Sequence, residues 1–148
     1  MPETDAVVIR PLRSDEYASV CAVWQAAGLP TRAAGRDSAD AFARQLERHS
    51  TTYLAAELDG RLVGVVLGTN DGRKGWINRL AVDPAHRKRG VAKRLLLACE
   101  AALNELGIEI VAALIEHGND ASVAAFESAG YQADVPVHYY RKRRRSDI

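Results

Sequence analysis

The stretch INRLAVDPAHRKRGVAKRLLLACEAALNELG, residues 77–107, carries the strongest structural signals in the chain. Its first part, up to Val82, is rich in aliphatic residues and predicts a strand. Asp83-Pro84 ends that strand, and from Val91 onward the apolar residues recur at helical spacing until Gly107, a typical stop signal. The stretch therefore predicts a strand, a basic loop and a helix that buries one face.

The loop between strand and helix, HRKRGVA at residues 86–92, gathers four basic or imidazole side chains. A helix N-terminus leaves several N–H groups unbonded, and its dipole favours negative charge. Gly90 lets the backbone come close to a ligand, and Ala92 keeps that approach clear of a large side chain. The N–H groups of residues 87–92 can therefore cradle a phosphate or pyrophosphate, with added charge from Arg87, Lys88 and Arg89. A solvated polar turn is the alternative, because the glycine spacings of the P-loop and dinucleotide motifs are absent.

The rest of the chain predicts one domain, residues 1–148, with a basic tail over 141–148. Before the central stretch we expect strands at 7–12, 51–58, 61–69 and 74–82, with helices from Ser14 to Gly28 and from Asp37 or Ser38 past Leu46. After it we expect a central strand at 108–116, a helix from Asn119 to Ala129, and two short strands, YQADV and HYYRKR, around Pro136. This order predicts a mixed sheet with helices on both faces.

Composition limits the classes of function. Apolar residues make up 47% and charged residues 26% of the chain, as in an ordinary globular protein, and no apolar run is long enough to span a bilayer. The start of the chain carries two acids and no apolar region, which argues against a secretory signal. The two cysteines, Cys21 and Cys99, fit reduced thiols in the cytoplasm. Together with four scattered histidines they show no metal-ligand spacing, so we expect no metal.

Positive charge is concentrated at one end of the chain. Residues 1–140 hold 15 of the 20 basic residues and 18 of the 19 acidic ones, a net charge of −3. This body does not present a basic nucleic-acid face. The run RKRRR at 141–145 offers attachment to RNA or to the ribosome as one interpretation, but short basic tails are usually solvated. We therefore expect neither a nucleic acid nor a membrane as partner, and the sequence leaves a homodimer open.

Residues 77–107 resemble the acetyl-CoA-binding core of the GNAT superfamily of N-acetyltransferases. That family's loop has Gln or Arg, two residues, Gly, one residue, and then Gly or Ala, and Arg87, Gly90 and Ala92 occupy those positions. The segment GNDASVAAFESAGY at 118–131 is also similar to the family, and the order of elements matches over nearly the whole chain. The resemblance implies an α+β fold with a mixed, mostly antiparallel sheet of six to seven strands and about four helices on its two faces.

The resemblance also implies a site for acetyl-CoA as cosubstrate. Backbone groups of Leu80, Ala81 and Val82 would bind pantetheine and the acetyl carbonyl, with a core-facing role as the alternative. The pyrophosphate would be bound by the amides of the loop: Arg87, Lys88, Arg89, Gly90, Val91 and Ala92. Asn119 and Phe126 would lie along the CoA arm, although Asn119 is a sound helix cap in any case.

The family's usual acid, a tyrosine that protonates the departing CoA thiolate, is replaced here by Phe126, which cannot donate a proton. Tyr139 and Tyr140, on the last expected strand, are the candidate acids, with packing as the alternative, and Tyr131 is expected to pack. A base must remove a proton from the acceptor ammonium before it attacks. Glu116 is the candidate base, with an exposed strand-end carboxylate as the alternative, and His117 and Glu57 are weaker choices.

The function that follows is an acetyl-CoA-dependent N-acetyltransferase. It would transfer the acetyl group directly to a primary amine of a small molecule, a protein or a peptide. Cys99 falls in mid-helix on the apolar face with no histidine near it in sequence, which argues against a covalent enzyme intermediate. A CoA-binding regulatory module with impaired catalysis is the alternative, and the sequence does not name the amine.

Overall fold

The computed structural model describes residues 6–134 and 136–147, and its centre is a five-stranded sheet. The strands are β1 (Val8–Pro11), β2 (Thr51–Leu58), β3 (Arg61–Asn70), β4 (Gly75–Val82) and β5 (Val111–Ala113). The helices are α1 (Tyr17–Ala26), α2 (Ala39–Leu46), α3 (Val91–Glu105) and α4 (Asp120–Ser128), with single turns of 3₁₀ helix at Ser14–Glu16 and Pro84–His86. None of the helices in the described ranges is long and apolar enough to cross a membrane.

The strands lie side by side in chain order, β1-β2-β3-β4-β5. The first three pairs are antiparallel, and the short turns Asp59-Gly60 and Asp71-Gly72 account for two of them, β2 with β3 and β3 with β4. Only β4 and β5 run parallel, joined through α3. The expected mixed, mostly antiparallel sheet is therefore confirmed.

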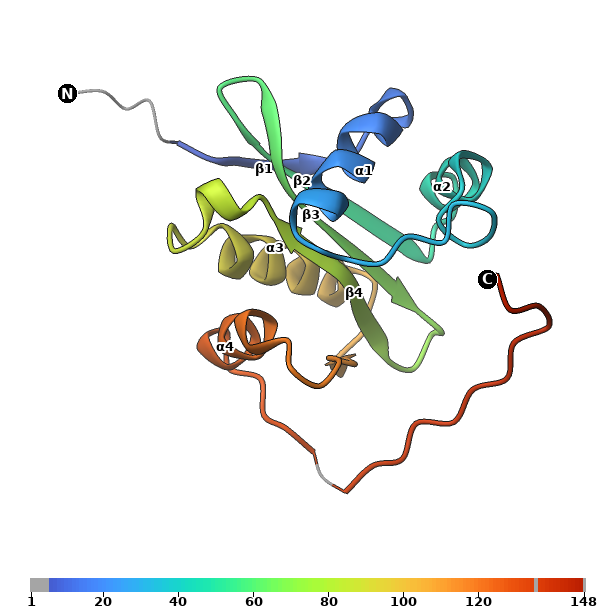
Figure 1. Ribbon diagram of the computed structural model, residues 1–148. Helices are drawn as coiled ribbons and strands as arrows, with labels where there is room; N and C mark the ends of the chain where they lie inside the picture. The colour runs from blue at the N-terminus through green and yellow to red at the C-terminus, as the bar shows by residue number, and fades with distance from the viewer. Residues whose placement is uncertain (1–5, 135, 148) are drawn as a thin grey trace.

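The helices cover both faces of this sheet, as the sequence predicts (Figure 1). On one face α3 and α4 bury a core that includes Val66, Leu95, Leu103 and Phe126. On the other face α1 and α2 bury a second core around Val20, Trp24, Phe42 and Tyr53. Successive β4 residues point to opposite faces, so Leu80 and Val82 contact the α3 core while Ala81 contacts the α1 core.

Two glycines of the sheet face helix α3 and let its side chains pack directly against the strands. A Cβ added at Gly68 would lie 2.5 Å from the Cys99 Sγ, and one added at Gly75 would lie 2.8 Å from a methyl carbon of Leu103. Real Cβ atoms do not approach this closely, so the absence of a side chain at these two positions sets the distance between helix and sheet.

Two sequence predictions about strands are wrong. The segment 108–116 is not a central strand: only Val111–Ala113 pair, at the edge of the sheet, and Ile110 and Leu114 are exposed. The segments YQADV and HYYRKR form no strand where they are described, and Val135 lies outside the described residues. A strand needs a partner edge, and the apolar residues of the tail remain in solvent: Val137, Tyr139 and Tyr140 are 69%, 67% and 87% exposed. The described sheet therefore has five strands instead of six or seven.

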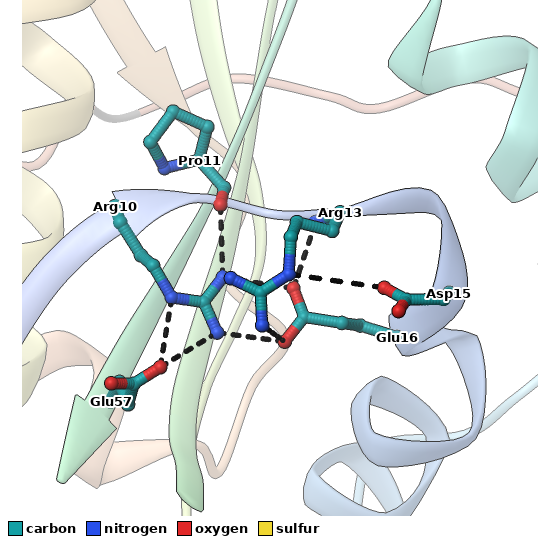
Figure 2. A network of polar contacts seen from close by, with 6 residues as sticks. All are labelled: Arg10, Pro11, Arg13, Asp15, Glu16 and Glu57. Atoms are coloured by element: carbon teal, nitrogen blue, oxygen red, sulfur yellow. Dashed lines mark hydrogen bonds and ion pairs between the residues drawn. The ribbon is translucent and has the colours of Figure 1, made fainter. Parts of the chain in front are cut away.

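A network of ion pairs fastens β1 to its neighbours (Figure 2). The Arg10 guanidinium donates to both carboxylate oxygens of Glu16, at 2.9 and 2.7 Å, and through Nε to Glu57 at 3.0 Å. Glu16 also accepts from the backbone N–H of Arg13 at 2.8 Å. This network connects β1, the 3₁₀ turn and β2, and it engages Glu57, one of the weaker candidate bases.

We expect this network to make folding stability sensitive to acid. Hydrogen bonds from Arg10 lower the pKa of Glu16 from 4.5 to about 2. A carboxyl with a depressed pKa in the folded state stabilises the fold above its unfolded pKa, and that contribution is lost as the pH falls from 4.5 towards 2. The Glu16 side chain is 12% exposed, and the full shift in its pKa corresponds to at most about 3.4 kcal/mol.

The measurement is urea unfolding across this pH range. Glu16→Gln should be less stable than the parent at pH 7 and should lose less stability between pH 4.5 and 2. Asp15→Asn, next to it but with a side chain that is 80% exposed, is the matched control and should follow the parent curve. Parallel curves for Glu16→Gln and the parent would contradict the assignment.

Candidate functional site

The sheet opens beside the second half of β4. The parallel pairing with β5 runs from Gly75 opposite Val111 to Ile77 opposite Ala113 and then stops. From Asn78 to Val82 this edge of β4 has no partner strand among the described residues, so its backbone polar groups on that side have no strand to bond. Leu80, Ala81 and Val82, the residues that the resemblance assigns to pantetheine, lie on this open edge.

The basic loop follows directly. Asp83 caps the 3₁₀ turn, its carboxylate accepting from the N–H of Ala85 at 2.9 Å, and the chain then passes through Lys88 and Gly90, both left-handed with φ of +63° and +77°. Lys88 is one of three described non-glycine residues with positive φ, a conformation that costs of order 1–3 kcal/mol and that concentrates at functional sites. Gly90 is the N-cap of α3 and adopts this conformation without strain.

The loop leaves a row of donors without intramolecular acceptors. Arg94 is the first residue of the helix whose N–H is bonded, to the carbonyl of Gly90 at 3.0 Å. In the described chain the backbone N–H groups of Lys88 to Lys93 have no such partner, and no side chain caps the helix. The side chains of Arg87, Lys88 and Arg89 are exposed around them, while Val91 is buried and Ala92 half-buried. This arrangement suits a diphosphate.

Asn119 and Phe126 lie on the neighbouring helix α4. Asn119 is its N-cap, with the side-chain oxygen accepting from the N–H of Ser122 at 3.2 Å, as the alternative interpretation expects. Phe126 is 5% exposed and meets the ring of Tyr131 edge-on at 5.0 Å. The hydroxyl of Tyr131 donates to Glu100 at 3.2 Å, so Tyr131 packs as expected.

The candidate acid and base residues are exposed and lie outside the helices and strands. Glu116 is exposed and lies three residues beyond the end of β5, where its backbone carbonyl accepts from the N–H of Asn119 at 3.2 Å. Tyr139 and Tyr140 lie on the exposed tail and not on the last strand from which their candidacy was argued. The structure therefore brings the residues predicted to bind acetyl-CoA together along β4 and α3. It does not gather the candidate acid and base residues around them.

Sequence reasoning missed a polar cluster on the other face of β4. Arg79, in the middle of the strand, has a φ of +53° at a bulge between β3 and β4. Its guanidinium lies 4.2 Å from the centre of the Trp24 ring, and it donates to the carbonyl of Pro30 at 2.7 Å. Asp37, 7% exposed, lies 3.9 Å away, too far for a hydrogen bond. The one signal in the sequence was a charged residue inside the apolar run INRLAV.

This cluster couples the loop between α1 and α2 to the open edge. Burial lowers the pKa of Arg79, and its Nε and Nη2 have no acceptor in the part of the chain described. The Trp24 ring and the Asp37 carboxylate compensate part of that burial. Asp37 in turn accepts from the N–H of Arg32 at 2.8 Å, and Tyr17 donates to its backbone carbonyl at 2.7 Å.

Cys99 does not have the properties of a nucleophile. It is fully buried against Gly68, and burial raises its pKa to about 12. A thiol needs the opposite, a depressed pKa and access to substrate.

The fold, together with the basic loop and its unbonded N–H groups at the start of α3, defines an acyltransferase of the GNAT type. The family model described as the acetyltransferase (GNAT) family matches residues 17–131. An acetyltransferase of Pectobacterium atrosepticum is 30% identical over 84% of this chain and 86% of its own length, and one of Sodalis glossinidius is 29% identical over 91% and 94%.

Solved structures agree on the fold. The aminoglycoside N-acetyltransferase AAC(6')-Iy in complex with CoA has a TM-score of 0.77 at 21% identity, covering 97% of this chain and 99% of that one. The PaiA N-acetyltransferase of Thermoplasma acidophilum in complex with coenzyme A has a TM-score of 0.77 at 17% identity, covering 87% and 91%. The chain belongs to the GNAT acetyltransferase family: it is an acetyl-CoA-dependent N-acetyltransferase, and this supports the enzyme over the binding module.

Proposed function

We propose that the open edge of β4 and the loop from Arg87 to Ala92 form the acetyl-CoA site of this enzyme. The observation that carries the proposal is the row of unpaired N–H groups from Lys88 to Lys93 beside an unpaired strand edge. The N–H groups offer hydrogen-bond donors and the helix dipole to the diphosphate. The strand edge offers backbone groups to the amide-rich pantetheine arm. Asn119 and Phe126, on α4, are retained as proposed contacts of the CoA arm.

Acetyl-CoA supplies an activated thioester, so the chain has to position it and to receive a free amine. An N–H on the open edge of β4, within Leu80 to Val82, would stabilise the charge that develops on the acetyl oxygen. The buried thiol of Cys99 supports direct transfer to the amine. Glu116 is retained as the proposed base and Tyr139 or Tyr140 as the proposed acid, all three outside the helices and strands. The free thiols Cys21 and Cys99 support a reducing, cytoplasmic location.

The test is a pair of measurements on the full chain. Acetyl-CoA at a hundredfold excess over its dissociation constant should stabilise the fold by about 2.7 kcal/mol in a thermal melt. Mass spectrometry over polyamines, amino acids, aminoglycosides and peptides should then find at least one amine that gains an acetyl group. A melt that acetyl-CoA leaves unchanged would refute the proposed site, whereas a shift without any acetylated amine would refute only the proposed transfer.

A further inference from the structure

Arginines from two separate segments of the chain gather at the loop between α1 and α2. Arg32 and Arg36 lie on the loop between α1 and α2, and the C-terminal tail returns towards that loop (Figure 1). The charge of Arg141, then burial, and then the charges of Arg32 and Arg36 lower the pKa of Arg143, so Arg143 lies within electrostatic range of the other three arginines. We call Arg32, Arg36, Arg141 and Arg143 the arginine patch.

The patch is not neutralised by the chain around it. Residues 30–37 and 136–147 contain seven arginines and lysines but only two carboxylates, Asp37 and Asp147. Asp147 pairs with Arg145 at 3.1 Å, and Asp37 is turned inward and accepts from the N–H of Arg32. Within the described residues no patch arginine has an ion pair, and the Nε of Arg143 is buried without an acceptor. Clustered like charges of this kind favour an anionic ligand.

The patch lies on the side from which an acceptor would approach. Arg79 fastens the Pro30–Asp37 loop to β4 one residue before Leu80, which lies on the open edge. The proposed diphosphate loop lies at the N-terminus of α3, so CoA occupies the α3 side of the open edge. The amine must then enter from the α1 side. A hollow on that side of the sheet is lined by Cys21, Gln25, Gly28, Leu29, Pro30 and Thr31.

We propose that the arginine patch selects amine acceptors that carry anionic groups, namely carboxylates on an amino acid or on an acidic peptide. The inference rests on the proposed function, because it names the acceptor of the same site. In the reaction the amine nitrogen loses a proton to the proposed base, Glu116, and bonds to the acetyl carbon. The carbon–sulfur bond breaks, and the CoA sulfur takes up a proton from the proposed acid, Tyr139 or Tyr140. The patch takes no part in these steps. It attracts the anionic end of the acceptor and repels polycationic amines.

The experiment compares acceptors with one reacting amine and different charges. Peptides that begin with alanine and continue with two Glu, two Gln or two Lys residues should rank in that order in kcat/KM. We expect at least tenfold between the first and last, expressed in KM and reduced by added salt. Free glutamate against free glutamine repeats the comparison for small acceptors and separates an amino acid from a peptide as the preferred source. Kanamycin represents the polycationic class.

The variants assign the preference to the patch. Arg32→Gln combined with Arg36→Gln should reduce the ratio between Glu and Lys peptides to within about threefold while the acetyl-CoA thermal shift is unchanged. The matched control combines Arg44→Gln with Arg48→Gln. Both arginines are exposed, Arg44 in α2 and Arg48 just after it, and this variant should keep the full ratio.

Three results would overturn the inference. One is equal kcat/KM for all three peptides, another is kanamycin as the best acceptor, and the third is an undiminished ratio in the patch variant. Weaker retention of RNA by the patch variant, with acceptor selection unchanged, would assign the patch to RNA instead. Loss of the acetyl-CoA shift in the parent chain is a separate outcome and would refute the proposed function.

Discussion

Gly90→Glu should remove the stabilisation of the fold by acetyl-CoA, and Gly107→Glu should leave it intact. The two glycines lie at opposite ends of α3, have similar φ of +77° and +85°, and have no atoms within 4 Å of an added Cβ. The backbone strain of a side chain is therefore alike at both, of order 1–3 kcal/mol. The difference is the site: a carboxylate at residue 90 would occupy the N–H groups that we assign to the diphosphate.

A thermal melt with and without acetyl-CoA measures this difference. The parent chain and Gly107→Glu should gain about 5–11 °C at a hundredfold excess of ligand, since 1 kcal/mol corresponds to roughly 2–4 °C in a domain of this size. Gly90→Glu should melt cooperatively without a gain, and acetyl transfer should be lost with it. A full ligand shift in Gly90→Glu would show that the diphosphate binds elsewhere.

Replacing Arg79 by Met should cost about 3 kcal/mol of stability and should raise the KM for the acceptor. The substitution keeps most of the bulk against Trp24, but it leaves the Asp37 carboxylate buried without its cation and the Pro30 carbonyl without its donor. The expected drop in Tm is about 6–12 °C. Binding of acetyl-CoA should persist, because the Arg79 side chain lies on the opposite face of β4 from α3.

Two further variants separate this role from a general loss of packing. Asp37→Asn added to Arg79→Met should cost less than the sum of the single changes, because the buried carboxylate is then neutral. Arg73→Met, an exposed arginine in the turn before β4, should change stability by no more than about 0.5 kcal/mol. A parent-like Tm and acceptor KM for Arg79→Met would show that the loop is held without it.

The basic loop at residues 86–92 could be predicted from the sequence because the patterns that define it are local. The Asp83-Pro84 turn, the glycine at 90 and the helical period from Val91 act within a few residues of one another, and the structure has each element there. The same reasoning failed for the tail. The aromatic residues of HYYRKR are compatible with a strand, but a strand forms only against a free sheet edge, and that is a property of the whole fold.

The polar cluster under β4 depends on contacts that sequence patterns do not contain. Arg79 donates to a carbonyl 49 residues away, and its burial follows from the bulge between β3 and β4. For Phe126, one property could be predicted from the sequence and another could not. That it cannot donate a proton follows from its chemistry, whereas its burial against Tyr131 follows from how α4 lies on α3.

The glycines beneath α3 link the packing of the core to the affinity for acetyl-CoA. Because Gly68 and Gly75 have no side chain, the Cys99 and Leu103 side chains of α3 pack directly on the sheet, and this packing supports the helix whose first turn adjoins the open edge of β4. A methyl group at either position would come within 3.0 Å of one of these side chains, so the packing beneath α3 would have to shift. Substitutions that never touch a ligand would then alter its binding, and directed evolution towards a bulkier acyl donor should find changes at these interior positions as well as in the loop.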